Sequence, residues 1–416
     1  MTSKFDRRRG LGLILILLGF ALPILYFIRQ AASPMAQPFT PAATAIVDRL
    51  IPTVPPKVSS AATTLTIPTA TIIRSTLRAT QTISPTATLL KPTPIRPTAA
   101  PATIAATTPP VIGSGSHQRF GIGVSSTGPW WANRLTDLNA GWFLNWSSLA
   151  AAGRPAGLEY ARMVRVPQGQ PSPDLATLTD IAQRSPGALW LIGNEPDVIW
   201  QDNATPEQYA SVYHDVYATL KQADPTSRIA IAGVSQPTPL RLRYLDRILA
   251  AYRQQFGADL PVDVWNVHNF ILPEKRGEWG VDIPPGLDAA SGLIVGIEDH
   301  DNLARFKQQI VDFRRWMADR GYRDKELIVS EYGILMYADF GFGYERVRDF
   351  MLGTFDYFRT ASDGALGQPA DGNRLVQRWC WYSLSDTQYP TGNLVDLTTG
   401  QLTALGQDFA DYVATH

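Results

Sequence analysis

The chain has 416 residues, 45% hydrophobic and 10% aromatic, and its 37 basic side chains balance 37 acidic ones. A chain without net charge has no large field to attract nucleic acid or an acidic surface, so we expect a neutral ligand and no nucleic-acid partner. The single cysteine, Cys380, excludes an intramolecular disulfide and a thiolate metal cage, and its apolar neighbours favour a small packed side chain.

The N-terminal residues carry a membrane-targeting pattern. A basic segment, residues 1–10, precedes an uncharged apolar run of 18 residues, Leu11 to Ile28. As a helix this run would span about 27 Å, close to the hydrocarbon core of a bilayer. The basic cluster should stay cytoplasmic, which predicts a single-pass anchor with the rest of the chain outside the cell. A cleaved signal peptide, giving a secreted protein, is the alternative, although no clear Ala-x-Ala site follows.

Residues 29–117 are rich in Thr, Pro and Ala. Their prolines favour extended conformations and large apolar side chains are scarce, so we expect a disordered, semi-extended stalk. The stalk could carry O-linked sugars or act as a spacer. The remaining residues, 118–416, suit one large α/β domain.

Eight short apolar runs, rich in branched and aromatic residues, alternate with longer amphipathic stretches in this domain. This alternation is typical of parallel strands joined by crossover helices. The predicted strands are RFGIGVSS (119–126), GWFLNWSS (141–148), YARMVRV (160–166), ALWLIGNEP (188–196), RIAIAGV (228–234), VDVWNVHNF (262–270), ELIVSEYGI (326–334) and LVQRWCWYSL (375–384).

Two stretches between the strands have clear helical signals. In the first, Thr205 is a capping residue, Pro206 takes the first helical position and Gln208 lies three residues after the cap. The second, 303–321, keeps an apolar stripe and ends at Gly321. Strand number and domain size predict an α/β fold of the (β/α)8 TIM-barrel type. A doubly wound open sheet is the alternative, but no Gly-x-Gly-x-x-Gly loop follows the first strand.

In such a barrel the carboxyl ends of the strands converge on the face that carries the chemistry. The residues at these ends are Asn145, Trp146, Arg165, Asn194, Glu195, His268, Asn269, Glu331, Tyr332, Trp381 and Tyr382. Two of them, Glu195 on the fourth strand and Glu331 on the seventh, are carboxylates. Glycoside cleavage needs one carboxyl to protonate the leaving oxygen and a second to attack the anomeric carbon or to activate water. Pro196 disfavours the α region for Glu195, so we expect an extended backbone there.

The motifs WLIGNEPD (190–197) and LIVSEYG (327–333) resemble those of the clan A glycoside hydrolases, which are retaining (β/α)8 enzymes. GWFLNWSS and the GNEPD form also resemble the glycosyl hydrolase catalytic core family, which includes endo-β-1,3-glucanases. The resemblance covers about residues 120–409 and implies that Glu195 is the acid/base and Glu331 the nucleophile. It further implies that Asn194 binds the sugar 2-hydroxyl and that Trp381 forms the floor of the cleavage subsite.

The sixth strand departs from the pattern of many clan members. His268 matches the usual histidine, but the aromatic residue near it is Phe270, so a hydroxyl contact to Glu331 would come from Tyr332 or Tyr382. Burial beside Trp190 and Trp200 should favour the neutral form of Glu195, whereas Glu331 must stay ionised. Arg165 would support that charge or would form a structural ion pair instead.

Six tryptophans are predicted in loops or at strand ends, where flat rings suit sugar stacking or ordinary rim packing: Trp130, Trp131, Trp146, Trp200, Trp279 and Trp381. The segment 271–302 is predicted to be a rim loop that shapes the groove. Its acidic residues Glu298, Asp299 and Asp301 could bind calcium, but helix capping is favoured, so we expect no metal and no cofactor.

Together these features predict a membrane-anchored or secreted, monomeric β-glycosidase that acts on an extracellular or cell-wall polysaccharide. Asn145, Asn194, His268 and the site aromatics would bind this substrate. It would act by double displacement through a covalent glycosyl-enzyme. β-1,3-Glucan is the favoured substrate, with xylosides, mannans and other β-linked polymers as alternatives. A non-catalytic carbohydrate-binding barrel and a stalked adhesin are the alternatives to an enzyme.

Overall fold

The structure, a computed structural model, describes residues 116–150 and 152–416. They contain a nine-stranded sheet in the order β3-β2-β1-β9-β8-β7-β6-β5-β4, in which every paired neighbour is parallel. The strands are β1 (Phe120–Gly123), β2 (Trp142–Leu144), β3 (Glu159–Tyr160), β4 (Arg162–Val164), β5 (Leu189–Asn194), β6 (Arg228–Gly233), β7 (Val264–His268), β8 (Glu326–Gly333) and β9 (Arg378–Tyr382).

All eight predicted strands are present, and the third is divided into β3 and β4 at Ala161. The edge strands of the sheet are therefore consecutive in the chain. The Ala161 amide donates to the Phe143 carbonyl, and the Met163 amide donates to the Ser147 carbonyl, both at 2.9 Å. This interrupted strand bridges the two ends of the sheet, which confirms the predicted (β/α)8 barrel.

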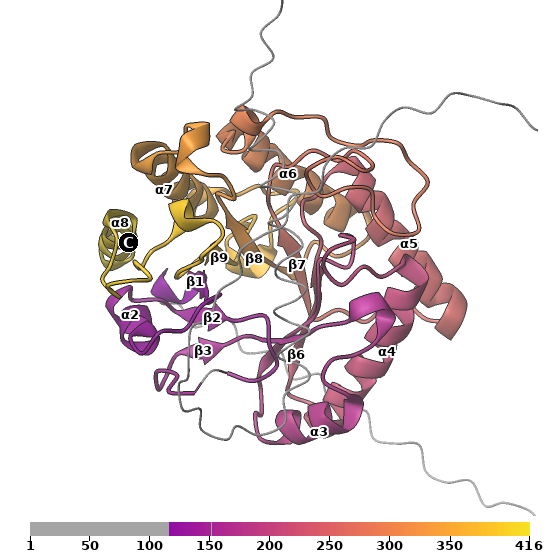
Figure 1. Cartoon of the computed structure of the whole chain (residues 1–416). Coiled ribbons are helices and arrows are strands. Elements are labelled where there is room, and N and C mark those ends of the chain that lie inside the picture. The colour runs from indigo at the N-terminus through magenta and orange to yellow at the C-terminus, as the bar shows by residue number, and fades with distance from the viewer. Residues whose placement is uncertain (1–115, 151) are drawn as a thin grey trace, which may run out of the picture. The chain divides into compact units, whose positions relative to one another are not determined.

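The helices surround the strands (Figure 1). They are α2 (Trp131–Asp137), α3 (Leu175–Gln183), α4 (Pro206–Ala223), α5 (Pro239–Phe256), α6 (Leu303–Asp319), α7 (Tyr344–Thr360) and α8 (Ala404–Thr415). Short 3-10 helices lie at Ser116–Arg119, Pro167–Gly169, Ile297–Asp299, Ala338–Phe340, Pro369–Asp371 and Pro390–Gly392. Between β2 and β3, the described residues form no helix, so the second unit of the barrel lacks its crossover helix.

The predicted start of α4 is confirmed. The Thr205 hydroxyl accepts from the Gln208 amide, the Gln208 side chain accepts from the Thr205 amide, and Pro206 takes the first position. Helix α6 begins after Asn302, whose side chain accepts from the Arg305 amide.

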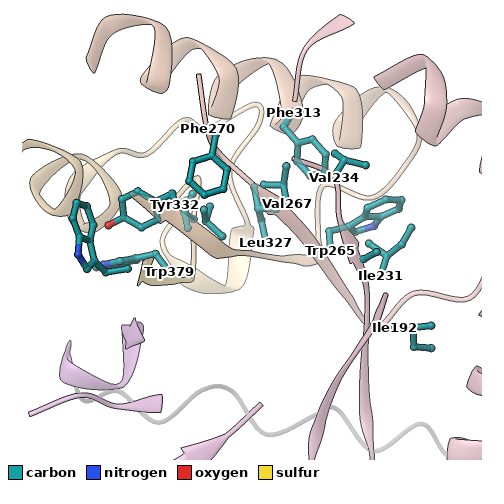
Figure 2. Close-up of a cluster of buried hydrophobic side chains, with 14 of the residues drawn as sticks. Ile192, Ile231, Val234, Trp265, Val267, Phe270, Phe313, Leu327, Tyr332 and Trp379 are labelled. Carbon is teal, nitrogen blue, oxygen red and sulfur yellow. The ribbon is translucent and has the colours of Figure 1, made fainter. Parts of the chain in front are cut away.

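Strand side chains alternate between two apolar layers. One layer fills the barrel and includes Leu144, Met163, Leu191, Ile328 and Cys380. The other lies between strands and helices, and Figure 2 shows part of it around Trp265, Phe313 and Tyr332. At the amino-terminal end of the barrel, buried Arg378 makes two 2.9 Å bonds to Glu159. Polar groups at the opposite, carboxyl-terminal end are thus left to form a site.

The predicted cytoplasmic segment, membrane span and most of the stalk fall within residues 1–115, outside the described residues. Among the residues that are described, none of the helices combines the length and apolar character needed to cross a bilayer.

Candidate active site

Glu195 follows the last residue of β5 and points into the mouth of the barrel. Its amide donates to the Gly233 carbonyl of β6 at 3.1 Å, and its side chain is 10% exposed. Its φ of 44° is left-handed, so the prediction of an extended backbone is wrong. Pro196 disfavours the right-handed helical region for Glu195, but Glu195 adopts the left-handed region instead of an extended conformation. Such a conformation costs about 1–3 kcal/mol and is typical of functional sites.

Glu331 lies within β8, and a β-bulge turns its side chain into the barrel. Val329 pairs with Trp379 whereas Tyr332 pairs with Trp381, so two residues of β8 oppose the single residue Cys380. The same shift occurs toward β7, where His268 pairs with Glu331. An extra residue in a strand reverses which side chains face inward. Glu331 therefore points inward, with 13% of its side chain exposed.

His268, the last residue of β7, lies between the two carboxylates. Its Nδ1 is 2.8 Å from Oε1 of Glu195 and 3.8 Å from Oε2 of Glu331. Its Nε2 is buried and has no hydrogen-bond partner among the described residues. Gly233 provides room for the ring, because a Cβ atom there would lie 2.3 Å from Cδ2 of His268.

Burial and mutual charge control the protonation of this cluster. Burial raises the pKa of Glu331 to about 7; the charge on Glu195 adds to this, while His268 and a hydrogen bond from Trp146 oppose it. Burial alone would lower the pKa of His268, but the charges of Glu331 and Glu195 outweigh it and raise that pKa. Glu331, which we expected to stay ionised, thus has a raised pKa, so that it is ionised only above about pH 7.

Trp146 and Asn145 follow β2. The indole Nε1 of Trp146 donates to Oε2 of Glu331 at 2.7 Å, so the structure brings this predicted residue into the site. Asn145 instead holds its own loop: its Oδ1 accepts from the Tyr160 hydroxyl at 2.6 Å, and its Nδ2 donates to the Leu149 carbonyl at 3.3 Å.

Arg165 and Asn194 share the carboxylate of Asp202. Nε of Arg165 donates to Oδ1 of Asp202 at 2.6 Å, and the Asn194 amide donates to Oδ2 at 2.7 Å. Of the two roles considered for Arg165, the ion pair is therefore present; its charge also lowers the pKa of Glu331, as the smallest of the contributions. Nδ2 of Asn194 donates to Gln201, and its Oδ1 is buried without a partner among the described residues.

Two predicted binding residues lie on the wrong face of their strands. Trp381 is fully buried between β9 and α7, where it packs against Phe350 and Phe355, so it is not the floor of a subsite. Tyr332 is also fully buried and packs against Trp381 and Phe358. Regular alternation places Trp381 outward, and the bulge before Tyr332 does the same for that residue.

Tyr382 takes the inward position at the end of β9. Its ring lies edge-on to Trp146 at 5.6 Å, and its hydroxyl donates to Oδ2 of Asp386 at 2.7 Å. Of the predicted rim aromatics, Trp131 is buried in α2, whereas Trp130, Trp200 and Trp279 are partly exposed and pack against the core. Trp190, expected to screen Glu195, is buried in the layer that faces the helices.

Two of the three acidic residues considered for calcium in the rim loop 271–302, Asp299 and Asp301, make contacts within the fold. Asp299 accepts from the Gly296 amide at 3.0 Å, and Asp301 forms an ion pair with Arg346 at 2.5 Å. Capping and ion pairing, rather than calcium binding, account for these two carboxylates.

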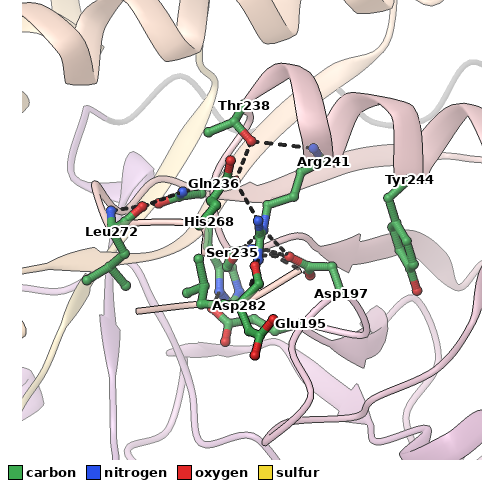
Figure 3. Close-up of polar contacts among 12 residues, drawn as sticks. Glu195, Asp197, Ser235, Gln236, Thr238, Arg241, Tyr244, His268, Leu272 and Asp282 are labelled. Carbon is green, nitrogen blue, oxygen red and sulfur yellow. Dashed lines mark hydrogen bonds and ion pairs between the residues drawn. The ribbon is translucent and has the colours of Figure 1, made fainter. Parts of the chain in front are cut away.

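A buried ion network beside the site was missed by the sequence reasoning. Arg241, at the start of α5, binds both Asp197 and Glu274, and all three side chains are 0% exposed. Figure 3 shows Arg241 beside Asp197 and Ser235. Arg241 also donates to the carbonyls of Val281 and Asp282 in the rim loop. Burial raises the pKa of Asp197, which the charge of Arg241 opposes. The network ties the loop that carries Glu195 to the rim loop.

Glu195, His268 and Glu331 also meet the minimum requirement for a metal site, since one ligand atom of each lies within 4.8 Å of the others. Ligands of a tetrahedral zinc ion, bound at 2.0–2.2 Å, lie about 3.5 Å apart. The wider spacing, and the bond that already joins His268 to Glu195, fit a proton-sharing cluster better than a preformed metal site.

Part of the chain matches a known protein family. Residues 121–279 match the glycosyl hydrolase catalytic core family. The predicted resemblance to this family is thereby confirmed over these residues. No curated protein sequence matches the chain.

Solved structures that align with the chain include three enzymes of glycoside hydrolase family 128. The Pseudomonas viridiflava subgroup II endo-β-1,3-glucanase is 20% identical with a TM-score of 0.50, and the alignment covers 70% of this chain and 96% of that one. The Sorangium cellulosum subgroup II endo-β-1,3-glucanase is 18% identical with a TM-score of 0.48, and the alignment covers 70% of this chain and 97% of that one. The Amycolatopsis mediterranei subgroup I endo-β-1,3-glucanase, in complex with laminaritriose, is 20% identical with a TM-score of 0.44, and the alignment covers 71% of this chain and 99% of that one.

The family match includes Glu195 and His268 but ends before β8. A role for Glu331 therefore depends on its position in the barrel, opposite Glu195 and within reach of the same histidine.

Proposed function

We propose that the protein is a retaining β-glycoside hydrolase that cleaves a β-1,3-glucan. The observation that carries this proposal is the pairing of Glu195 and Glu331 at the carboxyl end of the barrel. Each comes from a different strand, each is largely buried, and each remains partly open to solvent.

The closeness of the two carboxylates favours retention. One oxygen of Glu195 lies within 4.8 Å of one oxygen of Glu331. The carboxyl groups of retaining glycosidases are about 5–5.5 Å apart, whereas those of inverting enzymes are about 6.5–9.5 Å apart because a water molecule must fit between substrate and base.

In the proposed reaction, Glu331 attacks the anomeric carbon while Glu195 gives a proton to the leaving oxygen. The glycosidic bond breaks and a glycosyl ester forms on Glu331. Glu195 then takes a proton from water as that water attacks the ester, which restores both side chains. His268 bonds one oxygen of Glu195 and leaves the other to face the substrate.

Attack requires ionised Glu331, whose pKa is raised to about 7. We therefore expect kcat/KM, which reports the free enzyme, to fall as the pH drops below about 7 and Glu331 gains a proton. The charge of His268 favours the ionised form, so its loss would move this limb to higher pH.

The proposed substrate follows from the family match and from the neighbours. The neighbours are named as endo- or exo-β-1,3-glucanases, and that from Amycolatopsis mediterranei is seen with laminaritriose. Partly exposed Trp130, Trp200 and Trp279 offer ring faces that suit pyranose stacking. A chain without net charge also suits a neutral polymer.

For the N-terminal part we keep the sequence-based assignment as a proposal. Residues 11–28 would anchor the protein, residues 29–117 would form the stalk, and residues 118–416 would act outside the cell. Protease treatment of intact cells, followed by a blot for the C-terminal domain, tests this proposal; a protected domain would contradict it.

The activity is tested with the full chain on a panel of curdlan, laminarin, xylan, mannan and cellulose. We expect release of reducing ends from the β-1,3-glucans. Glu195→Ala and Glu331→Ala should each lower this rate by at least about a thousandfold, because each removes a group that acts in the transition state.

Azide separates the two roles. It should restore turnover in the variant that lacks the acid/base and yield a β-glycosyl azide. Two variants with wild-type rates would remove the enzymatic proposal, whereas binding of glucan without hydrolysis by the native chain would favour the carbohydrate-binding barrel.

A further inference from the structure

We propose that Trp146 is a positioning residue for the nucleophile: its indole N–H holds Oε2 of Glu331, so that Oε1 is the oxygen that attacks. This inference rests on the proposed function. It changes the role predicted for Trp146 from a platform for sugar stacking to a hydrogen-bond donor within the catalytic machinery.

The contact is direct and largely buried. Nε1 of Trp146 lies 2.7 Å from Oε2 of Glu331, and the tryptophan is 9% exposed. His268 is closest to the same oxygen, at 3.8 Å. Oε2 therefore has its hydrogen-bond donor in Trp146, because Nδ1 of His268 lies too far from it for a bond and is 2.8 Å from Oε1 of Glu195 instead. A hydrogen bond to a charged acceptor is about twice as strong as one between neutral groups, so this contact can fix the rotation of the carboxylate.

The surroundings of Trp146 hold its ring in place. Its backbone adopts a left-handed φ of 53°, which aims the side chain across the mouth of the barrel. Gly123 of β1 leaves space for it, since a Cβ atom there would lie 2.8 Å from Cη2 of the indole. On another side Tyr382 packs edge-on, and the hydroxyl of Tyr382 is tied to Asp386.

The bond serves both steps of the reaction. In the first, Oε1 forms a bond to the anomeric carbon as the leaving oxygen departs with the proton from Glu195. Oε2 then becomes the carbonyl oxygen of the ester and keeps the N–H donor. In the second step water adds to the anomeric carbon, the ester bond breaks and the negative charge returns to the carboxylate, where the indole again stabilises it.

The same bond affects the titration of Glu331, since it lowers that pKa. The other groups that act on Glu331 are His268 from β7, Glu195 after β5 and Arg165 after β4. From β9, Cys380 and Tyr382 face it as neutral groups, because burial raises the pKa of each well above its usual range. Loss of the indole N–H should therefore move the acid limb to higher pH.

The test compares Trp146→Phe with Trp142→Phe in the full chain. Trp142 is a control from β2, four residues before Trp146: it is fully buried, and its Nε1 donates to the Arg119 carbonyl at 3.2 Å, away from Glu331. The probe is 2-deoxy-2-fluoro-β-laminaribiosyl fluoride, whose covalent adduct with Glu331 is followed by intact mass and peptide mapping.

We expect Trp146→Phe to slow adduct formation about ten- to a hundredfold, the range for a hydrogen bond to a charged group. The acid limb of the rate should shift to higher pH. Trp142→Phe, corrected for its folded fraction, should form the adduct at the wild-type rate with an unshifted limb.

A second variant removes the N–H but keeps the shape of the ring: benzothienylalanine at position 146. It should reproduce the loss seen with phenylalanine, and it serves if Trp146→Phe does not fold. Wild-type adduct formation in this variant, or a raised KM with an unshifted acid limb, would overturn the role of Trp146. Adduct formation by Glu331→Ala would instead overturn the proposed function.

Discussion

Two pairs of buried acidic side chains lie side by side at the carboxyl end of this barrel, and they differ in what neutralises them. Asp197 and Glu274 share the guanidinium of Arg241, and all three are sealed from solvent. Glu195 and Glu331 are joined by His268 and remain 10% and 13% exposed. Burial of carboxylates is therefore not what marks the site.

The comparison shows how one region stabilises the other. A guanidinium with two carboxylates and further donors from Ser235, Gln236 and Thr238 forms a satisfied network that fixes two loops. At the other pair, the pKa values of Glu331 and of His268 are raised and one face stays open, which suits proton transfer but costs stability.

The largest expected difference between the two pairs is in activity. Glu331→Gln should lower kcat on β-1,3-glucan by at least about a thousandfold, because an amide cannot form the glycosyl ester. Glu274→Gln should retain most of the wild-type kcat per folded molecule, because Glu274 is sealed from substrate. Initial rates with folded fractions from circular dichroism check this, and equal losses in both variants would erase the distinction.

The second expected difference is in stability. Arg241→Met leaves two buried carboxylates without their cation and should lower the free energy of unfolding by about 3–5 kcal/mol. Arg253→Met is the control, since Arg253 forms a highly exposed ion pair with Asp259, and such pairs contribute about 0–1 kcal/mol. Urea denaturation measures both. Similar midpoints for the two variants would contradict a structural role for the buried network.

The support beneath His268 is tested by Gly233→Ala. The new Cβ atom would overlap the imidazole, so we expect a cost of about 1–3 kcal/mol and a reduced kcat as the ring moves away from Glu195. Gly364→Ala, where a Cβ atom meets no atom within 4 Å, should leave both quantities unchanged. An active, fully stable Gly233→Ala variant would show that the position of His268 is not critical.

The smallest expected effect is a dependence of stability on pH. The pKa of Glu331 is raised from its ordinary value of 4.5 to about 7. Ionisation of Glu331 therefore destabilises the folded wild-type protein as the pH rises from 4.5 through 7. The Glu331→Gln variant has no carboxyl group to ionise, so it does not undergo this loss of stability. The variant should therefore gain about 1–3 kcal/mol relative to wild type between pH 4 and pH 8. Thermal denaturation at both pH values tests this, and a constant difference would contradict the raised pKa.

Much of the barrel was predictable because strands buried on both faces have distinctive sequences. Runs such as ALWLIGNEP have apolar residues without a break, and each of the eight predicted runs contains a strand. The two carboxylates were also identified, because a charge directly after such a run indicates its polar end. The division of the third strand at Ala161 had no signal in the sequence.

The orientation of single side chains was less predictable. The bulge in β8 reverses the faces of Glu331 and Tyr332, and no residue type in SEYG announces it. Trp381 was misplaced for a simpler reason: Cys380 faces the barrel, so its neighbour must face the helices. The left-handed Glu195 shows that a following proline restricts a residue without choosing its conformation.

The Arg241 network could not be predicted, because its ion pairs join residues 44 and 33 positions apart in the sequence. The sequence analysis gave Asp197 no role, and only the packed loops show that it is a buried partner of Arg241.

The stereochemistry of cleavage tests the central claim most directly. Proton NMR of the native chain acting on laminarin, recorded within the first minutes, identifies the first-formed anomer before mutarotation. Double displacement through Glu331 predicts that the β-anomer appears first and the α-anomer follows. An α-anomer that appears first would show inversion and would exclude Glu331 as the nucleophile.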